Sequence, residues 1–352
     1  MGYKTMDANE AVSRVSYKFT EIAGIYPITP ASPMAEKVDV LASKGEINFW
    51  GNKVKVIEME SEKGAIATVH GALQAGVLAT TYTASQGLLL MIPSIYKMAG
   101  EMLPGVIHVA ARSLSTHSLS IFGDHQDIYA VRQTGACMLS SSSVEEAYHM
   151  AMVSHLASIK SSLPFINFFD GFRTSHEIDK VKEIDLSKLE TLIDKKALRK
   201  FRDNGMISGA TTRGTAENED VYFQHTESRN GYYIKAIDNV IYYMDKINKI
   251  CKTDYNIQAG ISELKAYEQF GKRCDTREYM KLAALLQTNI RKGTKELRRL
   301  LEEETADAFE KRKNMAKIKG EEATTKLLMP MMMMLMIVMA IIMIPAVWSF
   351  QI

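Results

Sequence analysis

Short apolar runs alternate with amphipathic segments along residues 5–180 of the chain. Short runs of apolar or β-branched residues predict strands, while apolar residues spaced three or four apart predict helices. Strands and helices that alternate in this way are typical of an α/β fold, a parallel sheet covered by helices. Strands are predicted at residues 22–26, 54–57, 79–83, 106–110, 136–139 and 165–169, and helices at 9–20, 34–41, 62–74, 86–99 and 143–158.

A proline-rich turn separates the first of these strands from the helix that follows it. Three prolines lie between Tyr26 and Met34, and because proline fixes φ and lacks an N–H donor, neither strand nor helix can continue through them. The turn presents Thr29 and Ser32 beyond a strand's carboxyl end, where ligands bind in open α/β sheets. An alternative interpretation is a rigid loop in which Ser32 caps the next helix ahead of Pro33.

Two other helices have candidate N-terminal caps. Asp7 or Asn9 can cap the helix predicted at residues 9–20, since short polar side chains accept hydrogen bonds from the first free N–H groups of a helix. Ser142 or Ser143 can do the same for the helix at 143–158.

The pattern changes after residue 180. Residues 186–256 are predicted to form a mostly helical extension with helices at 196–203 and 232–250, and residues 257–326 a charged helical segment. Tyr242, Tyr243, Ile247 and Ile250 have the spacing of a packing stripe on one helix.

The C-terminal part contains a long uncharged segment. Residues 327–348 form a run of 22 residues without a charged side chain. A helix of that length spans about 33 Å, which is enough to cross a bilayer core. We therefore predict a transmembrane helix at 327–350, with the lysines and arginines of residues 311–326 on the cytoplasmic side of an inner-membrane anchor. A buried core helix is the alternative.

Composition narrows the possible functions. A length of 352 residues allows one large or two medium domains, and a net charge of +2 gives no reason to expect a nucleic-acid partner. The three cysteines are far apart and no Cys-x-x-Cys motif occurs, so neither an iron–sulfur cluster nor a zinc site has its usual ligand spacing. The N-terminus lacks the apolar segment of a secretory signal. No metal site is predicted on this chain.

Several motifs follow one another in an order that identifies a family. They are Y-P-I-T-P-A-S-P-M-A-E at 26–36, V-K-V-I-E-M-E-S-E at 54–62, T-A-S-Q-G-L-L-L-M-I-P at 83–93, I-F-G-D-H-Q-D at 121–127 and F-F-D-G-F-R-T-S-H-E at 168–177. With these motifs the chain resembles, over residues 4–255, the N-terminal domain of pyruvate:ferredoxin (flavodoxin) oxidoreductases. The resemblance implies an α/β domain of the thiamine diphosphate pyrimidine-binding type at residues 1–185.

The resemblance also implies roles for three residues. Catalysis with thiamine diphosphate requires a carboxyl group that hydrogen-bonds the aminopyrimidine ring in a dry pocket. By resemblance Glu62 is this catalytic and cofactor-binding carboxyl, with Glu58 a weaker candidate, and Thr29 and Arg112 bind the 2-oxoacid, with Thr29 also close to the cofactor. Without the resemblance, Glu62 reads as a first-turn glutamate favoured by the helix dipole. Arg112 then reads as half of a structural ion pair.

Other parts of the resembled enzyme have no counterpart here. The Gly-Asp-Gly segment that holds the diphosphate through Mg²⁺ is missing, as are iron–sulfur cluster ligands. We therefore expect the pyrimidine half of a shared site, completed by a second copy or by a complementary subunit. The full enzyme would convert pyruvate to acetyl-CoA and pass electrons to ferredoxin or flavodoxin. Lys63 replaces the alanine usual in the family, and it either points outward or weakens cofactor activation through Glu62.

Residues 260–352 resemble a different family, the C-terminal part of the inner-membrane platform proteins of type II secretion and tight-adherence pilus systems. The matching segments include F-G-K-R-C at 270–274 and G-E-E-A-T-T-K-L-L-M-P at 320–330. Two alternative hypotheses follow, namely a membrane component of a secretion or pilus system and a fusion of two incomplete genes.

Overall fold

A computed structural model describes residues 3–209 and 211–251, together with the isolated residues 284, 310, 313, 314, 317, 318 and 334. The chain divides into two units, Met1–Thr253 and Asp254–Ile352, and the fold below belongs to the first. Within the described residues no helix is both long and apolar enough to cross a membrane. The segments predicted at 257–326 and 327–350 lie outside the continuous described ranges, so the predicted anchor gains no support.

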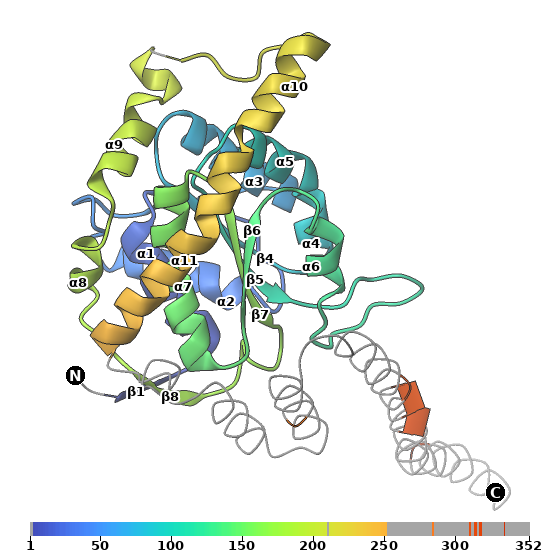
Figure 1. The fold of residues 1–352 in the computed structure, drawn as a ribbon. Helices are drawn as coiled ribbons and strands as arrows, with labels where there is room; N and C mark the ends of the chain where they lie inside the picture. Colours follow the sequence, from blue (N-terminus) through green and yellow to red (C-terminus); the bar gives the residue numbers. More distant parts are fainter. Residues whose placement is uncertain are drawn as a thin grey trace, which may run out of the picture. The chain divides into compact units, whose positions relative to one another are not determined.

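A six-stranded parallel sheet forms the centre of the first unit (Figure 1). Its strand order is β3-β2-β4-β5-β7-β6. The sheet confirms the predicted α/β class, and each of the six predicted strands is present within two residues of its expected bounds. The observed strands are β2 (Ile22–Ile25), β3 (Lys55–Glu58), β4 (Ala79–Thr83), β5 (Val106–Ala111), β6 (Cys137–Ser141) and β7 (Phe165–Asp170).

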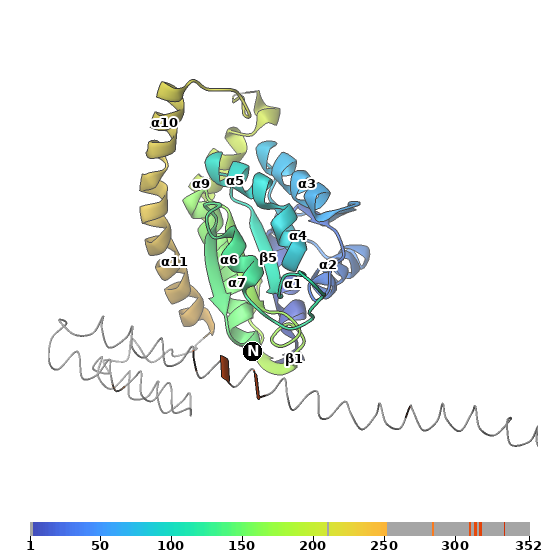
Figure 2. The same cartoon turned by 90° about the vertical axis from the view of Figure 1, so that its right-hand side faces the viewer.

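Helices cover both faces of the sheet (Figures 1 and 2). One face carries α1 (Ala8–Phe19), α2 (Ser32–Ser43) and α7 (Val144–Ser161). On the other lie α3 (Glu62–Gln74), α4 (Ser85–Leu90), α5 (Ile92–Gly100) and α6 (Gln126–Val131). The central strands are buried on both sides, which is typical of a parallel sheet between two helical layers.

Two of the predicted caps are confirmed. Asp7 accepts a hydrogen bond from the Glu10 N–H at 2.7 Å, and Ser143 accepts one from the Glu146 N–H at 3.2 Å. Asn9 is buried in the first turn of α1 and donates to the Pro30 carbonyl at 3.1 Å.

The predicted cap at Ser32 is wrong. Ser32 is itself the first residue of α2, Ala31 is the N-cap, and no side chain caps the helix. The Ala31 and Ser32 N–H groups both donate to the Ile28 carbonyl, at 2.8 and 2.9 Å, so the backbone closes the turn and the helix begins two residues earlier than predicted.

The helix predicted at residues 86–99 is divided in two. α4 ends at Leu90 and α5 begins at Ile92, with Pro93 in its first turn. Proline has no N–H to continue the hydrogen bonds of the preceding helix, so the chain restarts a helix where proline is tolerated.

Further elements follow or flank the sheet. A small antiparallel pair joins β1 (Tyr3–Met6) to β8 (Asp179–Lys182), and neither strand was predicted. The remaining helices are α8 (Ser187–Glu190), α9 (Lys195–Asp203), the 3₁₀ turn η1 (Met206–Ser208), α10 (Glu219–Ser228) and α11 (Asn230–Cys251).

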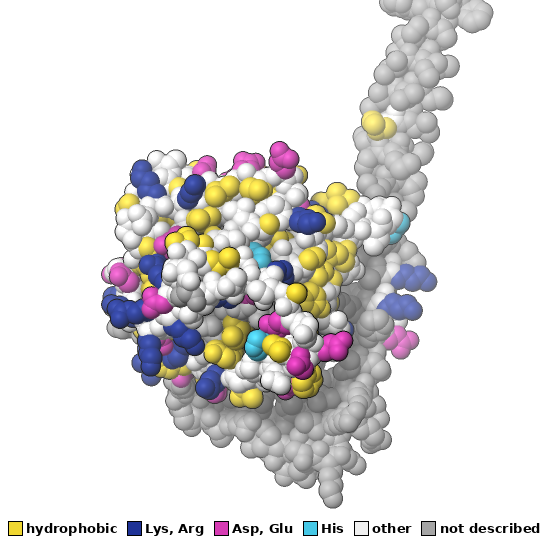
Figure 3. All heavy atoms as spheres, turned by 90° about the horizontal axis from the view of Figure 1, so that it is seen from above, with side chains coloured by type: hydrophobic (Ala, Val, Ile, Leu, Met, Phe, Trp, Pro, Cys, Tyr) yellow, Lys and Arg dark blue, Asp and Glu magenta, His cyan; other side chains and the backbone are white. Residues whose placement is uncertain are grey.

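Helix α11 lies along α7 (Figure 1). Of the stripe predicted on it, Tyr243 and Ile247 are buried, as a packing role requires. Tyr242 is exposed, and the Lys160 ammonium lies 4.3 Å from the centre of its ring. Lys and Arg side chains gather on the side of the domain where α9 lies (Figure 3), since α9 presents Lys195, Lys196 and Arg199 to solvent.

Candidate active-site half

The three predicted site residues lie at the carboxyl edge of the sheet. Thr29 follows β2, Glu62 follows β3 as the first residue of α3, and Arg112 follows β5. Chain connections run in opposite directions on the two sides of β2, because β3 lies on one side and β4 on the other. Such a topological switch point leaves a crevice at the strand ends, where open α/β sheets bind ligands.

Arg112 and Thr29 are in direct contact. The Arg112 Nη1 group donates a 2.7 Å hydrogen bond to the Thr29 carbonyl oxygen, so it contacts the backbone and leaves the hydroxyl free. Arg112 is 8% exposed, whereas the Thr29 side chain is exposed. Burial lowers the pKa of Arg112 and the nearby Asp127 carboxylate opposes that effect, but an arginine remains charged at any working pH. The Arg112 Nε atom is buried without a hydrogen-bond partner.

Glu62 is the buried carboxyl of its segment. It is 7% exposed, whereas Glu58 and Glu60 are exposed. Of the two candidates, Glu62 and Glu58, only Glu62 therefore has the dry surroundings that the predicted role requires. Ser61 caps α3 by accepting a hydrogen bond from the Gly64 N–H at 3.2 Å. Lys63 is exposed and makes no ion pair with Glu62, which agrees with the outward orientation.

The Glu62 carboxyl lies against the start of α4. A Cβ atom added to Gly87 would come within 2.7 Å of Glu62 Cγ and Oε1, and within 2.6 Å of Thr83 Oγ1. The Thr83 hydroxyl is buried and has no hydrogen-bond partner. Gly87 therefore leaves the space that Glu62 occupies, and a polar atom without a partner lies beside it.

We predict that Gly87→Ala displaces Glu62 and destabilises the domain. The new methyl group would overlap the Glu62 and Thr83 side chains, and overpacking of this kind costs about 1–3 kcal/mol. Urea unfolding measures the loss. Gly231→Ala is the control, because a Cβ there meets no atom within 4 Å. Equal stability of both variants would contradict the close contact at Gly87.

Asp127 also lies at this edge, although no role was predicted for it. Its side chain is fully buried at the start of α6. One oxygen, Oδ2, accepts hydrogen bonds from the Ser85 N–H at 2.8 Å and the Arg112 N–H at 3.1 Å, and Oδ1 accepts from the Ile128 N–H at 2.8 Å. Burial raises the pKa of Asp127, and the three N–H donors oppose that effect. The sign of Asp127 in the sequence was its place at the end of the family motif I-F-G-D-H-Q-D.

The other polar residues of that motif do not form a metal site in the described part of the chain. His125 Nε2 lies 2.8 Å from Asp170 Oδ1 at the end of β7. Groups of three or more potential ligands are absent from the residues that the structure describes. The His125 contact joins the loop before α6 to the end of β7.

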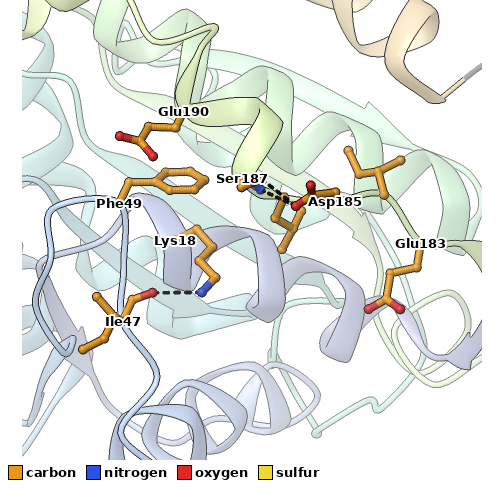
Figure 4. Close-up of a pocket in the computed structure, with 9 residues that line it drawn as sticks. Lys18, Ile47, Phe49, Glu183, Asp185, Ser187 and Glu190 are labelled. Atoms are coloured by element: carbon orange, nitrogen blue, oxygen red, sulfur yellow. Dashed lines mark hydrogen bonds between the residues drawn. The ribbon is translucent and has the colours of Figure 1, made fainter. Parts of the chain in front are cut away.

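A separate cavity is lined by other segments of the domain (Figure 4). It has a volume of about 610 Å³ and is lined by residues of α1, of the loop before β3 and of the segment after β8, namely Lys18, Ile47, Phe49, Glu183, Ile184, Asp185, Leu186, Ser187 and Glu190. Its polar groups are partly engaged, since Lys18 donates to the Ile47 carbonyl at 2.8 Å. Because Thr29, Glu62 and Arg112 do not line it, this cavity is distinct from the predicted site.

Comparison with known proteins identifies the family to which this chain belongs. Residues 14–245 match the model of the thiamine diphosphate-binding region of pyruvate flavodoxin/ferredoxin oxidoreductases. A pyruvate-flavodoxin oxidoreductase of Klebsiella pneumoniae is 52% identical over 277 residues, which is 78% of this chain and 24% of that protein. A pyruvate:ferredoxin oxidoreductase of Moorella thermoacetica is 51% identical over 258 residues, 73% of this chain and 22% of that protein.

A solved structure also matches part of this chain. The 2-oxoglutarate:ferredoxin oxidoreductase of Magnetococcus marinus matches with a TM-score of 0.47 and 22% identity, covering 53% of this chain and 32% of that one. The predicted resemblance of residues 260–352 to secretion and pilus platform proteins finds no support among these matches.

The chain spans about a quarter of the length of the curated relatives named above. The family model covers more than half of the chain, and its limits enclose all the elements from β2 to α10. The chain therefore belongs to the pyruvate flavodoxin/ferredoxin oxidoreductase family, and residues 14–245 are its thiamine diphosphate-binding region.

Proposed function

We propose that this domain supplies the pyrimidine-facing half of a thiamine diphosphate site together with the contacts to a 2-oxoacid such as pyruvate. The observation that carries the proposal is that a buried carboxyl, Glu62, and a buried guanidinium, Arg112, both follow strands at the carboxyl edge of one parallel sheet. In the complete enzyme the reaction would be oxidative decarboxylation to acetyl-CoA, with ferredoxin or flavodoxin as electron acceptor.

The polar groups at this edge fit the cofactor. Thr83 Oγ1 and Arg112 Nε are buried without partners, and buried polar atoms are normally hydrogen-bonded. Glu62 can hydrogen-bond a nitrogen of the pyrimidine ring from the first turn of α3, and its proton can move to and from that nitrogen. When bound, thiamine diphosphate supplies the electron sink for decarboxylation.

Arg112 and Thr29 can hold the substrate. A guanidinium has five N–H donors, and the contact to the Thr29 carbonyl uses one of them. The remaining donors can bind a carboxylate with the fork geometry that favours arginine. The exposed Thr29 hydroxyl can donate to the substrate's carbonyl oxygen, so both residues orient the 2-oxoacid.

The other half of the site must come from elsewhere. The described residues contain no cluster of metal ligands, while the diphosphate of this cofactor is held through Mg²⁺. We propose that further domains or a complementary subunit supply the Mg²⁺ site and the iron–sulfur clusters. The purified chain should then fail to oxidise pyruvate without such a partner, which an assay with a viologen dye as acceptor can measure.

Ligand-observed NMR titration of the full chain tests the proposed half-site. We expect weak binding of thiamine diphosphate that Glu62→Gln reduces at least tenfold, because the amide is a weaker hydrogen-bond partner and cannot exchange the proton. Glu60→Gln is the matched control, since Glu60 is exposed two residues away. We expect Arg112→Gln to weaken the binding of pyruvate by tenfold or more, which is the usual loss for a charge-assisted hydrogen bond. Unchanged affinities in both site variants would refute the assignment.

A further inference from the structure

The proposed half-site has two sides, one around Glu62 and one around Arg112, which lie at the ends of different strands. These two sides must keep a fixed separation to act on one substrate. The Glu62 side is bounded by Thr83 and Gly87, at the junction of β4 and α4. The Arg112 side begins at the end of β5. Strand pairing fixes the register between β4 and β5 only as far as Thr83 and Val109, before either chain turns into the site.

One carboxylate oxygen connects the two junctions beyond that point. Asp127 Oδ2 accepts the N–H of Ser85, at the start of α4, and the N–H of Arg112, just after β5. A second bridge runs parallel to it, because the Ser85 hydroxyl donates to the Ser113 carbonyl at 2.7 Å. Beyond the sheet hydrogen bonds, Asp127 therefore joins the Glu62 side to the Arg112 side.

The chemistry of this link requires a carboxylate. Asp127 receives the N–H groups of Ser85, Arg112 and its own neighbour Ile128, and only an ionised carboxylate has two oxygens that accept without donating. An asparagine would direct its NH₂ group at one of these donors. Burying a charge without an ion pair is costly unless hydrogen bonds compensate it. Among the described residues Asp127 makes no salt bridge, so its three N–H donors provide that compensation together with the nearby charge of Arg112.

The backbone of Ser85 also requires this support. Ser85 has a φ of 50°, in the left-handed region that costs energy for residues other than glycine. Such a conformation persists only where its surroundings hold it, and here the Asp127 carboxylate and the Ser113 carbonyl are the groups that do so. Loss of the carboxylate would allow the start of α4, and Gly87 with it, to relax away from Glu62.

We propose that Asp127 is a positioning residue that fixes the Arg112 side of the site relative to the Glu62 side. It acts through the Ser85 and Arg112 backbones and does not touch the substrate. The proposal rests on the proposed function, because it is meaningful only if Glu62 and Arg112 serve one site.

A double-mutant cycle in the full chain tests the proposal, with pyruvate titrated by ligand-observed NMR. We expect Asp127→Asn to weaken the binding of pyruvate at least fivefold. We expect the Arg112→Gln/Asp127→Asn double variant to bind no more weakly than Arg112→Gln alone, because Asp127 acts through Arg112. A merely structural role would instead make the two losses multiply, and that result would overturn the proposal.

Asp194→Ala is the control for a general loss of stability. Asp194 also accepts two backbone N–H groups, from Lys196 and Ala197, but it caps α9 and lies in none of the site segments. Pyruvate affinity in Asp194→Ala should stay within twofold of the wild type, and an Asp127→Asn loss no larger than this would overturn the proposal.

Two further measurements keep the test decisive. If Asp127→Asn does not fold, Ser85→Ala removes only the parallel hydroxyl bridge and should weaken pyruvate about twofold to threefold, whereas no change would count against the link. A wild-type chain that binds no pyruvate would refute the proposed function itself. In that case the amide protons of Ser85 and Arg112 should still give downfield NMR signals that are lost in Asp127→Asn. Those signals would show that both N–H groups donate to one Asp127 oxygen.

Discussion

Replacing Gly24 with alanine should destabilise the domain by about 3 kcal/mol, at the upper end of the cost of overpacking. Gly24 lies in β2 with α3 packed directly on it, and a Cβ atom there would come within 2.5 Å of the Ala65 carbonyl oxygen. A backbone oxygen cannot rotate away as a side chain can, so strand and helix must separate. Urea unfolding of the variant and the wild type measures the difference in free energy of unfolding.

Gly71→Ala is the matched control for this substitution. Gly71 lies in α3, the same helix that packs over Gly24, but a Cβ atom on it would meet nothing within 4 Å. Alanine is favoured over glycine inside a helix, so this variant should be more stable by about 0.5–1 kcal/mol. The two alanines should therefore have opposite effects, and a Gly24→Ala domain as stable as Gly71→Ala would mean that α3 does not pack on β2 in this way.

Acid should destabilise the domain well before its carboxylates are protonated. Burial lowers the pKa of His108 to about 3 and that of His149 to about 4. An unfolded histidine titrates near 6.5, so below this pH the unfolded chain binds more protons than the folded one and stability falls as the pH falls. Each of the two histidines should cost about 2 kcal/mol between pH 7.5 and pH 5, from about 1.4 kcal/mol per pH unit.

The His149→Leu variant isolates one of these contributions. Both ring nitrogens of His149 are buried without partners, so leucine removes the titrating group without breaking a hydrogen bond. Urea unfolding at the two pH values should show a pH dependence about 2 kcal/mol smaller than in the wild type. The full wild-type dependence in His149→Leu would show that this histidine does not stay neutral in the folded domain.

The sheet could be predicted from the sequence because its signals are local. Each central strand is a short run rich in apolar, aromatic or β-branched residues, and such runs are typical of parallel strands buried on both faces. The strands β1 and β8 were missed for the opposite reason. Lys182 pairs with Tyr3, although the two residues are far apart in the sequence. The D-K-V-K sequence of β8 has only one apolar residue. A pairing across that distance leaves no pattern in either segment.

The residues of the candidate site were named from the sequence, but the contacts between them were not. The resemblance identified Thr29, Glu62 and Arg112, and the parallel sheet explains why segments so far apart reach one edge. The sequence did not indicate that Arg112 would bond the Thr29 carbonyl, or that Asp127 would receive the Arg112 N–H. Both contacts use backbone groups, which every residue has, so no residue type marks them.

The order of the strands limits how far this domain can be shortened. Every residue assigned to the site precedes Ile128, yet β5, which leads to Arg112, pairs along its whole length with β7 at residues 165–170. A fragment ending after α6 would keep all the named side chains and leave the six residues of β5 with a free row of N–H and C=O groups. An apolar strand with an open edge is a template for aggregation. The smallest portion that can carry the site therefore continues through β7.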